Sequence, residues 1–210
     1  MVPGPVELRV VDPDLPAATT ESAERILDAT LALIARWGVA KTALGDVAKE
    51  AGCSRATLYR AFPGGKQHLL LALGERELVA YVGAIAEAID EAADLEEALT
   101  MAVVVASRLL RDHAAAQFVL DHEPGLLLPF LGFHQVDRLY GHTAIALGPH
   151  LERFLPADRA GWAAEWTARA FISFIFNPRA DLDLADIDDA RGLVQRFLLP
   201  AFVPMITSPT

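Results

Sequence analysis

Residues 42–66 read TALGDVAKEAGCSRATLYRAFPGGK, and their spacing predicts two short helices joined by a tight turn. The first helix is indicated by apolar residues three and four positions apart, namely Leu44, Val47, Ala48 and Ala51. Thr42 precedes this stripe, where it can cap the helix, and Gly52 follows it, where a left-handed residue ends many helices. Ser54 can cap the second helix, which Pro63 and two glycines end. Two short helices connected in this way form a helix-turn-helix.

The second predicted helix turns Leu58 and Phe62 towards the first helix, and no acidic residue lies between Ser54 and Lys66. At about 100° per residue, the remaining positions at its start and on its outer side are small, hydroxyl-bearing or basic, namely Arg55, Ala56, Thr57, Tyr59 and Arg60. Arginine can bond guanine O6 and N7 together, and alanine permits close approach to a base. Hydroxyl groups and a helix N-terminus suit phosphates. The pattern therefore favours duplex DNA, although a mildly basic helix pair in an ordinary bundle would show it too.

A longer run of short motifs surrounds this stretch: RIL at 25–27, Trp37-Gly38, VAKEAG at 47–52, SRATLY at 54–59 and LLLAL at 69–73. Together they span about fifty residues and are far more specific than an isolated motif. This run resembles the N-terminal DNA-binding domain of the TetR family of transcriptional regulators. One departure is Gly45, which stands inside the predicted second helix of the head where that family usually has a better helix former.

The 3.6-residue period along the chain and the resemblance together predict an all-α fold in three parts. A flexible arm at residues 1–19 would precede a three-helix head at residues 20–65, and residues 66–210 would form a larger helical body for ligand binding and dimerisation. Together with the residue pattern, the resemblance assigns DNA contacts to Thr42, Ser54, Arg55, Ala56, Thr57, Tyr59, Arg60 and Lys66. It also implies a homodimer on a near-palindromic operator and a repressor that a small-molecule effector releases.

The distribution of charge agrees with a DNA-binding head. The chain has 210 residues and a formal net charge of −10, which by itself argues against nucleic acid. However, residues 1–66 hold eight basic and eight acidic side chains, whereas residues 67–210 hold ten and twenty. All three lysines also lie in the first third. The local charge, rather than the total, meets the duplex.

Other classes of protein have little support in the sequence. The single cysteine, Cys53, excludes an internal disulfide, and no signal peptide or apolar run of about 20 residues is present. We therefore expect a cytoplasmic protein without membrane contact. His134 and Asp137 have a spacing that a metal could use, but the paired Glu-x-x-His sets are missing. No catalytic serine motif or nucleotide-binding glycine motif occurs, so we expect no enzyme, metal or cofactor.

Helical periodicity continues along the chain. It predicts helices over residues 20–37, 66–92, 95–112, 114–122, 134–154, 158–177 and 187–205, with Asp94 or a neighbour as a cap. Pro200 should either kink the last helix or shorten it. Family resemblance implies that the last two helices form the dimer interface. The apolar side chains expected there are Trp162, Phe171, Phe197 and Phe202.

Residues 124–133, PGLLLPFLGF, interrupt the helices with two prolines and two glycines. They suit either a connection that crosses the core or the wall of an apolar pocket. The predicted pocket residues are uncharged and come from elements expected to converge: Val104, Ser107, Phe118, Leu127, Phe130, Phe133, His134, Trp166 and Phe171. The sequence thus favours a repressor with an apolar effector, and the alternative is an all-helical carrier or enzyme whose head only resembles a DNA-binding domain.

Overall fold

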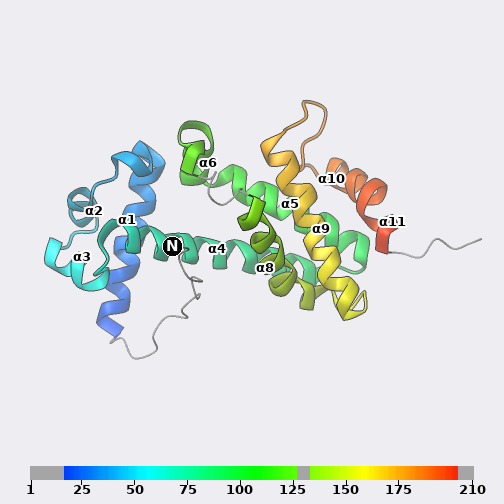
Figure 1. Cartoon of the computed structure of the whole chain (residues 1–210), viewed down its shortest axis with the longest axis horizontal. Helices are drawn as coiled ribbons and strands as arrows, with labels where there is room; N and C mark the ends of the chain where they lie inside the picture. Colours follow the sequence, from blue (N-terminus) through cyan, green and yellow to red (C-terminus); the bar gives the residue numbers. More distant parts are fainter. Residues whose placement is uncertain (1–16, 127–132, 203–210) are drawn as a thin grey trace, which may run out of the picture. The chain divides into compact units, whose positions relative to one another are not determined.

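The computed structural model describes residues 17–126 and 133–202, without the side chains of residues 17–20 and 133–139. Every regular element in these ranges is helical, and the described chain contains no strand (Figure 1). The prediction of an all-α fold is therefore confirmed. The chain divides into two compact units, Met1–Leu73 and Gly74–Thr210. The long helix α4 (Gly65–Glu91) begins in the first unit and continues into the second.

The first unit contains a three-helix head made of α1 (Ala17–Lys41), α2 (Leu44–Glu50) and α3 (Arg55–Ala61). Its centre is a set of side chains at most 5% exposed, namely Ile26, Leu27, Leu33, Ile34, Val47, Leu58, Phe62 and Leu69. Most of the stripe predicted for residues 20–37 is therefore buried. Trp37 is the exception: it is 44% exposed, directly before the kink at Gly38, which has a φ of 82°.

The residues predicted to begin and end the helices of the helix-turn-helix are confirmed at two positions and wrong at one. Gly52 takes a φ of 64°, and the Ser54 hydroxyl accepts the Thr57 N–H at 3.0 Å, so both predicted helix-end roles are confirmed. The predicted cap of the first helix is wrong, because the N-cap of α2 is Ala43, which makes no side-chain bond. The Thr42 hydroxyl instead donates to the Gly38 carbonyl at 2.7 Å and is buried in the turn after α1.

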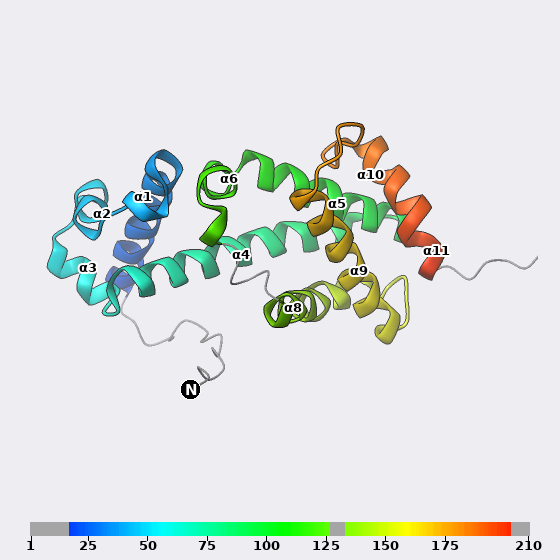
Figure 2. The same ribbon diagram turned by 45° about the horizontal axis from the view of Figure 1, so that its top comes forward.

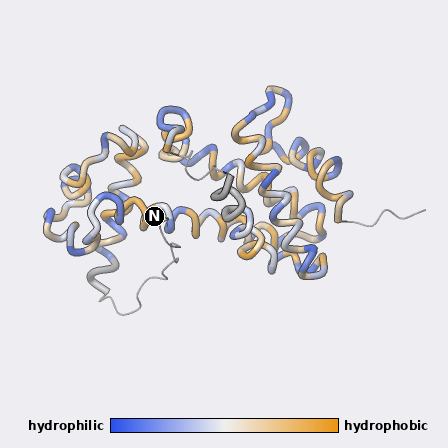
Figure 3. Tube along the Cα trace, viewed as in Figure 1, coloured by the Kyte–Doolittle hydropathy of each residue, from blue (hydrophilic) through white to orange (hydrophobic). Residues whose placement is uncertain are grey.

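The second unit is a bundle whose helices agree closely with the predicted ranges. After α4 come α5 (Leu95–Asp112), α6 (Ala114–His122), the short 3₁₀ segment η1 (Pro124–Leu126), α8 (Phe133–Leu151) and α9 (Ala157–Phe176). Asp94 caps α5 by accepting the Glu97 N–H at 2.9 Å, as predicted. Bands of hydrophilic and hydrophobic residues alternate along these helices, as expected for amphipathic helices around one core (Figure 3).

The predicted last helix is divided into three segments: α10 (Ile187–Leu193), a π-helical segment η2 (Val194–Leu198) and α11 (Leu199–Phe202). The change of hydrogen-bond register directly precedes Pro200, which has no N–H to continue an α-helical ladder. The segment α10 packs on α5, and η2 packs on both α5 and α9. Leu193, Val194, Leu198 and Phe202 belong to the core and are at most 5% exposed. Pro200 therefore follows a change of helix type.

Helices α8 and α9 lie side by side in both views (Figures 1 and 2). They come closest where two glycines meet, because a Cβ atom on Gly148 would lie 3.2 Å from the Gly161 Cα atom. At the far end of α8, Arg153 donates to the carbonyls of Asp90 and Ala92, and the His150 ring lies 2.9 Å from the Asp90 carboxylate. These contacts join α8 to the end of α4. No described helix is long and apolar enough to cross a membrane.

Candidate DNA-binding surface and body cavities

The outer face of α3 collects five of the residues predicted to contact DNA. Ser54, Arg55, Ala56, Tyr59 and Arg60 are exposed, whereas Leu58 on the opposite side is completely buried. We call this exposed set, with Thr57, the α3 surface. Thr57 is half-buried, and its hydroxyl lies 2.9 Å from that of Ser54. The structure therefore presents two guanidinium groups and several hydroxyl groups along one short helix.

Two predicted DNA contacts have other partners in the head. Thr42 is only 3% exposed and its hydroxyl is bonded to Gly38, so it supports the turn rather than the surface. The Lys66 ammonium donates to the carbonyl oxygens of Val39 at 2.6 Å and Ala40 at 3.4 Å. Lys66 thus joins the start of α4 to the last residues of α1, beyond the kink at Gly38. Sequence reasoning missed both roles because each partner lies outside the local helix.

The connection from α3 into α4 depends on a glycine. Gly65 has a φ of 64°, a backbone conformation that is strained for other residues. A Cβ atom there would lie 3.8 Å from the Tyr59 ring and 3.7 Å from the Leu44 side chain. Gly65 therefore allows the chain to turn into α4 beside Tyr59, one of the α3-surface residues.

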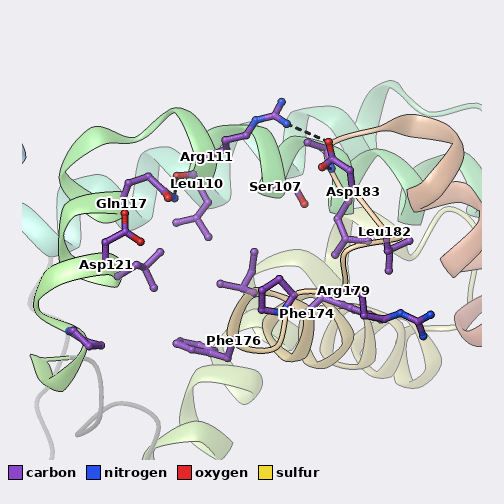
Figure 4. Close-up of a pocket in the computed structure, with 16 residues that line it drawn as sticks. Ser107, Leu110, Arg111, Gln117, Asp121, Phe174, Phe176, Arg179, Leu182 and Asp183 are labelled. Carbon is purple, nitrogen blue, oxygen red and sulfur yellow. Dashed lines mark hydrogen bonds and ion pairs between the residues drawn. The ribbon is translucent and has the colours of Figure 1, made fainter.

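The body contains a larger cavity of about 440 Å³ between α5, α6, the end of α9 and the segment that follows α9 (Figure 4). Its walls mix apolar side chains such as Leu110 and Phe174 with polar ones such as Gln117 and Asp121. Arg111 and Asp183 form an ion pair of 3.4 Å across one side of it. The cavity is open to solvent and has both signs of charge on its rim, so it suits an amphipathic or polar molecule better than a purely apolar one.

A smaller cavity of about 130 Å³ lies between α4, α5, α8 and α9. Its lining is almost entirely apolar, and the polar side chains in it are Tyr81, Thr143 and Thr167. The Tyr81 hydroxyl donates to the Ala106 carbonyl at 2.9 Å, and Thr167 donates to the Ala163 carbonyl at 2.7 Å. Burial raises the pKa of Tyr81 far above its usual range, so the phenol stays neutral. We call this space the apolar cavity.

The predicted pocket residues are not gathered at one place. Ser107 lines the larger cavity and Phe171 lines the apolar cavity. Val104, Phe118 and Trp166 line neither: Val104 is completely buried in the core, Phe118 stacks on His122 at 4.4 Å, and Trp166 is 53% exposed. Leu127 and Phe130 lie outside the described residues, and Phe133 and His134 begin α8 with side chains that are not described.

Several lining residues escaped sequence reasoning, above all Tyr81 and Thr167. Both stand in apolar helical stripes, where a buried polar residue looks the same whether it faces packed core or a cavity. Among the described residues, no three histidine, cysteine, aspartate or glutamate side chains gather as they would around a metal ion.

The second helix of the helix-turn-helix is exposed on its outer face and has no acidic residue, and the chain continues into a helical body with cavities. These features are typical of DNA-binding transcriptional regulators. The family description "Bacterial regulatory proteins, tetR family" matches residues 26–73. The chain is 30% identical over 195 residues to the uncharacterized HTH-type transcriptional regulator Rv1255c of Mycobacterium tuberculosis, and the match covers 90% of each protein.

Solved structures agree with this relationship. The TetR family repressor AlkX from Dietzia sp. strain DQ12-45-1b, implicated in biodegradation of n-alkanes, is 26% identical, with a TM-score of 0.60 over 82% of this chain and 91% of AlkX. The fatty acid degradation regulator FadR from Bacillus halodurans shares the fold, with 19% identity and a TM-score of 0.57 over 82% of this chain and 94% of FadR.

The chain belongs to the TetR family of bacterial transcriptional regulators. It is a DNA-binding regulator, and the relatives are regulators rather than enzymes. The predicted class is thereby confirmed, and the alternative of an enzyme or carrier with a similar head is not supported.

Proposed function

We propose that the chain is a repressor whose α3 surface binds a near-palindromic operator and whose body binds an apolar effector. The observation that carries the first part is the α3 surface itself. Arg55 and Arg60 are exposed there without an acidic neighbour on α3, and the Ser54 cap holds the start of the helix. We assign base contact to Arg55 and phosphate contact to the hydroxyl groups of Thr57 and Tyr59.

Selection of bound sequences from a random duplex pool tests this assignment. The wild-type protein should enrich two half-sites about one helical turn apart, or a multiple of it. Arg55→Ala should lose preference at particular base pairs, at a cost of roughly 1–3 kcal/mol. Tyr59→Phe should instead weaken all sequences to a similar extent. If Arg55→Ala selects the wild-type motif, the assignment of base contact is wrong.

Dimerisation is proposed through α9 and the last helical segments. Trp162 and Phe197 are each 67% exposed and Trp166 is 53% exposed, which is more aromatic surface than an isolated body readily leaves in water. Two residues of the predicted interface do not fit: Phe202 is only 4% exposed, and Phe171 lines the apolar cavity. Both side chains pack inside their own chain.

A double variant, Trp162→Ser with Phe197→Ser, tests the interface. Its molar mass in light scattering should fall towards that of one chain of 22.7 kDa, while circular dichroism stays helical. Leu126→Ser, which removes an exposed apolar side chain outside α9 and the last segments, is the matched control and should leave the mass unchanged. A wild-type monomer at micromolar concentration would contradict the proposed dimer.

The apolar cavity supports an apolar effector. Its walls include Leu78, Val82 and Ile85 of α4, so a molecule bound there would contact the same helix that begins in the head. Its volume lies below the roughly 300–1,000 Å³ of most ligand pockets, so the bound molecule must widen it. Widening favours a different conformation of the bundle, and the effector weakens operator binding only by its preference for that conformation. AlkX, a repressor implicated in n-alkane degradation, makes n-alkyl compounds the first probes.

Cavity-filling variants test the effector site. Ala106→Leu should fill the apolar cavity and abolish binding of n-alkanes and n-alcohols in calorimetry, and Ala146→Leu on the exposed side of α8 is the control. Leu110→Trp fills the larger cavity instead, which has the volume and polar rim for an amphipathic effector. If Leu110→Trp alone removes binding, the effector occupies the larger cavity. An effector that binds equally well to free and DNA-bound protein would refute the proposed release.

A further inference from the structure

Gly45 stands in the middle of the first turn of α2, where glycine has no evident backbone role. The glycines with positive φ in the described chain are Gly38, Gly52 and Gly65, so Gly45 adopts an ordinary helical conformation that alanine would adopt more readily. A glycine inside a helix weakens it and usually has a packing or functional reason. In a helix of only seven residues that reason needs to be substantial.

The neighbour of Gly45 is the guanidinium group of Arg55. A Cβ atom on Gly45 would lie 2.4 Å from Arg55 Nη2, 3.2 Å from Cζ and 3.3 Å from Nε. The three nearest atoms all belong to that one side chain. The Nη2 end of the Arg55 guanidinium therefore occupies the space that a side chain at position 45 would fill, and it reaches there from the next helix of the motif.

The close approach to Gly45 also limits where the guanidinium end of Arg55 can move. Within the described residues, Arg55 makes no hydrogen bond or ion pair, and the residue is exposed. A long side chain without polar partners samples many rotamers and loses that freedom when it binds. A guanidinium whose Nη2 end fits beside Gly45 of α2 has fewer rotamers to lose when it binds.

We propose that Gly45 is a specificity-determining positioning residue, because its missing side chain seats the Arg55 guanidinium for base contact. This inference rests on the base contact assigned to Arg55 above. Gly45 itself contacts no base, and it acts by positioning Arg55. The displaced group in any larger variant is the far end of a flexible side chain, so the cost falls on the position of Arg55 rather than on the fold of the head.

The test uses the full-length protein, the duplex that the wild type selects from a random pool, and a scrambled duplex of equal length. Gly45→Ala should fold at least as stably as the wild type, since alanine favours helix. Its affinity for the selected duplex should fall roughly 5- to 150-fold, the range of one bidentate base contact, while affinity for the scrambled duplex stays unchanged. Gly45→Ser should behave in the same way and serves as a second variant.

A double-mutant cycle separates positioning from a general effect. In an Arg55→Ala background, adding Gly45→Ala should change affinity for the selected duplex less than about twofold, because the group to be positioned is gone. Gly141→Ala is the matched control: it adds a methyl group to α8, where no atom lies within 4 Å of the new Cβ atom. It should leave both affinities unchanged.

The outcomes distinguish this inference from the proposal beneath it. If Arg55→Ala loses base preference but Gly45→Ala keeps the wild-type motif and affinity, Gly45 has no positioning role and the proposed DNA contact stands. The inference is also overturned if Gly45→Ala weakens both duplexes equally, or if its effect persists without Arg55. If Arg55→Ala itself selects the wild-type motif, the base contact and the positioning role fail together.

Discussion

Replacing Lys66 by methionine would show whether this lysine contacts DNA phosphate or holds the head together. Its ammonium donates to the carbonyls of Val39 and Ala40, at 2.6 and 3.4 Å, from the start of α4. Methionine keeps most of the apolar stem and removes the charge and both bonds. The residues that accept them are at the end of α1, after the kink at Gly38 and shortly before α2. Lys66→Met should therefore loosen the entry to the helix-turn-helix.

The expected size follows from the geometry. A hydrogen bond to a charged group contributes about 1.5–3 kcal/mol, and Lys66 is half-buried, so screening by water reduces this. The second bond is long and adds little. We expect local opening of residues 39–45 to become easier by about 1–2 kcal/mol, which corresponds to a loss of hydrogen-exchange protection of roughly 5- to 30-fold.

Two measurements on the same variant decide the question. Hydrogen exchange followed by mass spectrometry reports the opening of residues 39–45, with Lys49→Met, an exposed lysine of α2, as the control for loss of charge. The salt dependence of binding to a random-sequence duplex reports phosphate contact, and its slope should be unchanged. If exchange matches the wild type while the slope falls by about one, Lys66 contacts phosphate and the structural role is refuted.

Three further predictions concern the body. Gly148→Ala should destabilise the protein by about 1 kcal/mol or more in urea unfolding, because its Cβ atom would press on the Gly161 backbone at 3.2 Å; Gly161→Ala, whose Cβ atom would meet only the Ala144 side chain at 4.0 Å, should be tolerated. His113→Ala should lose about 1–2 kcal/mol and expose the α6 amides to exchange, since His113 Nδ1 accepts the Ala116 N–H at 3.1 Å and Nε2 lies 3.1 Å from the Glu77 carboxylate. Tyr81 stays neutral in the fold because burial raises its pKa, whereas the unfolded chain ionises near pH 10. Stability present below pH 10 should therefore fall as pH rises above it, and Tyr81→Phe should remove that part of the decline in alkaline unfolding curves.

Signals carried by neighbours in sequence could be predicted well. Ser54, Gly52 and Asp94 act on the backbone within three residues of themselves, so their roles at helix ends follow from local chemistry alone. The helical ranges follow for the same reason, because a 3.6-residue period needs no knowledge of the partner helix. Among the described helices, the last differs most, because its π-helical segment ends two residues before Pro200.

Roles that depend on the path of the backbone or on which helix covers a residue could not be predicted. Threonine often caps helices, but the Thr42 hydroxyl donates to the carbonyl of Gly38, where the backbone kinks. Trp37 and Trp166 lie in apolar stripes, yet both are about half-exposed, because periodicity identifies a stripe without showing whether another element covers it. For the same reason, periodicity did not show which of the predicted pocket residues lie together. Whether Phe171 faces packed core or a cavity depends on how four helices meet.

The distribution of charge along the chain restricts DNA binding to the head. The first 66 residues are formally neutral, so the whole net charge of −10 belongs to residues 67–210. An acidic body repels phosphate and adds no non-specific affinity of its own. Binding must then come from the head, where two arginines of α3 are exposed and Lys66 has backbone partners. We therefore expect a shallow salt dependence per chain and a binding free energy that depends unusually strongly on how Arg55 is placed.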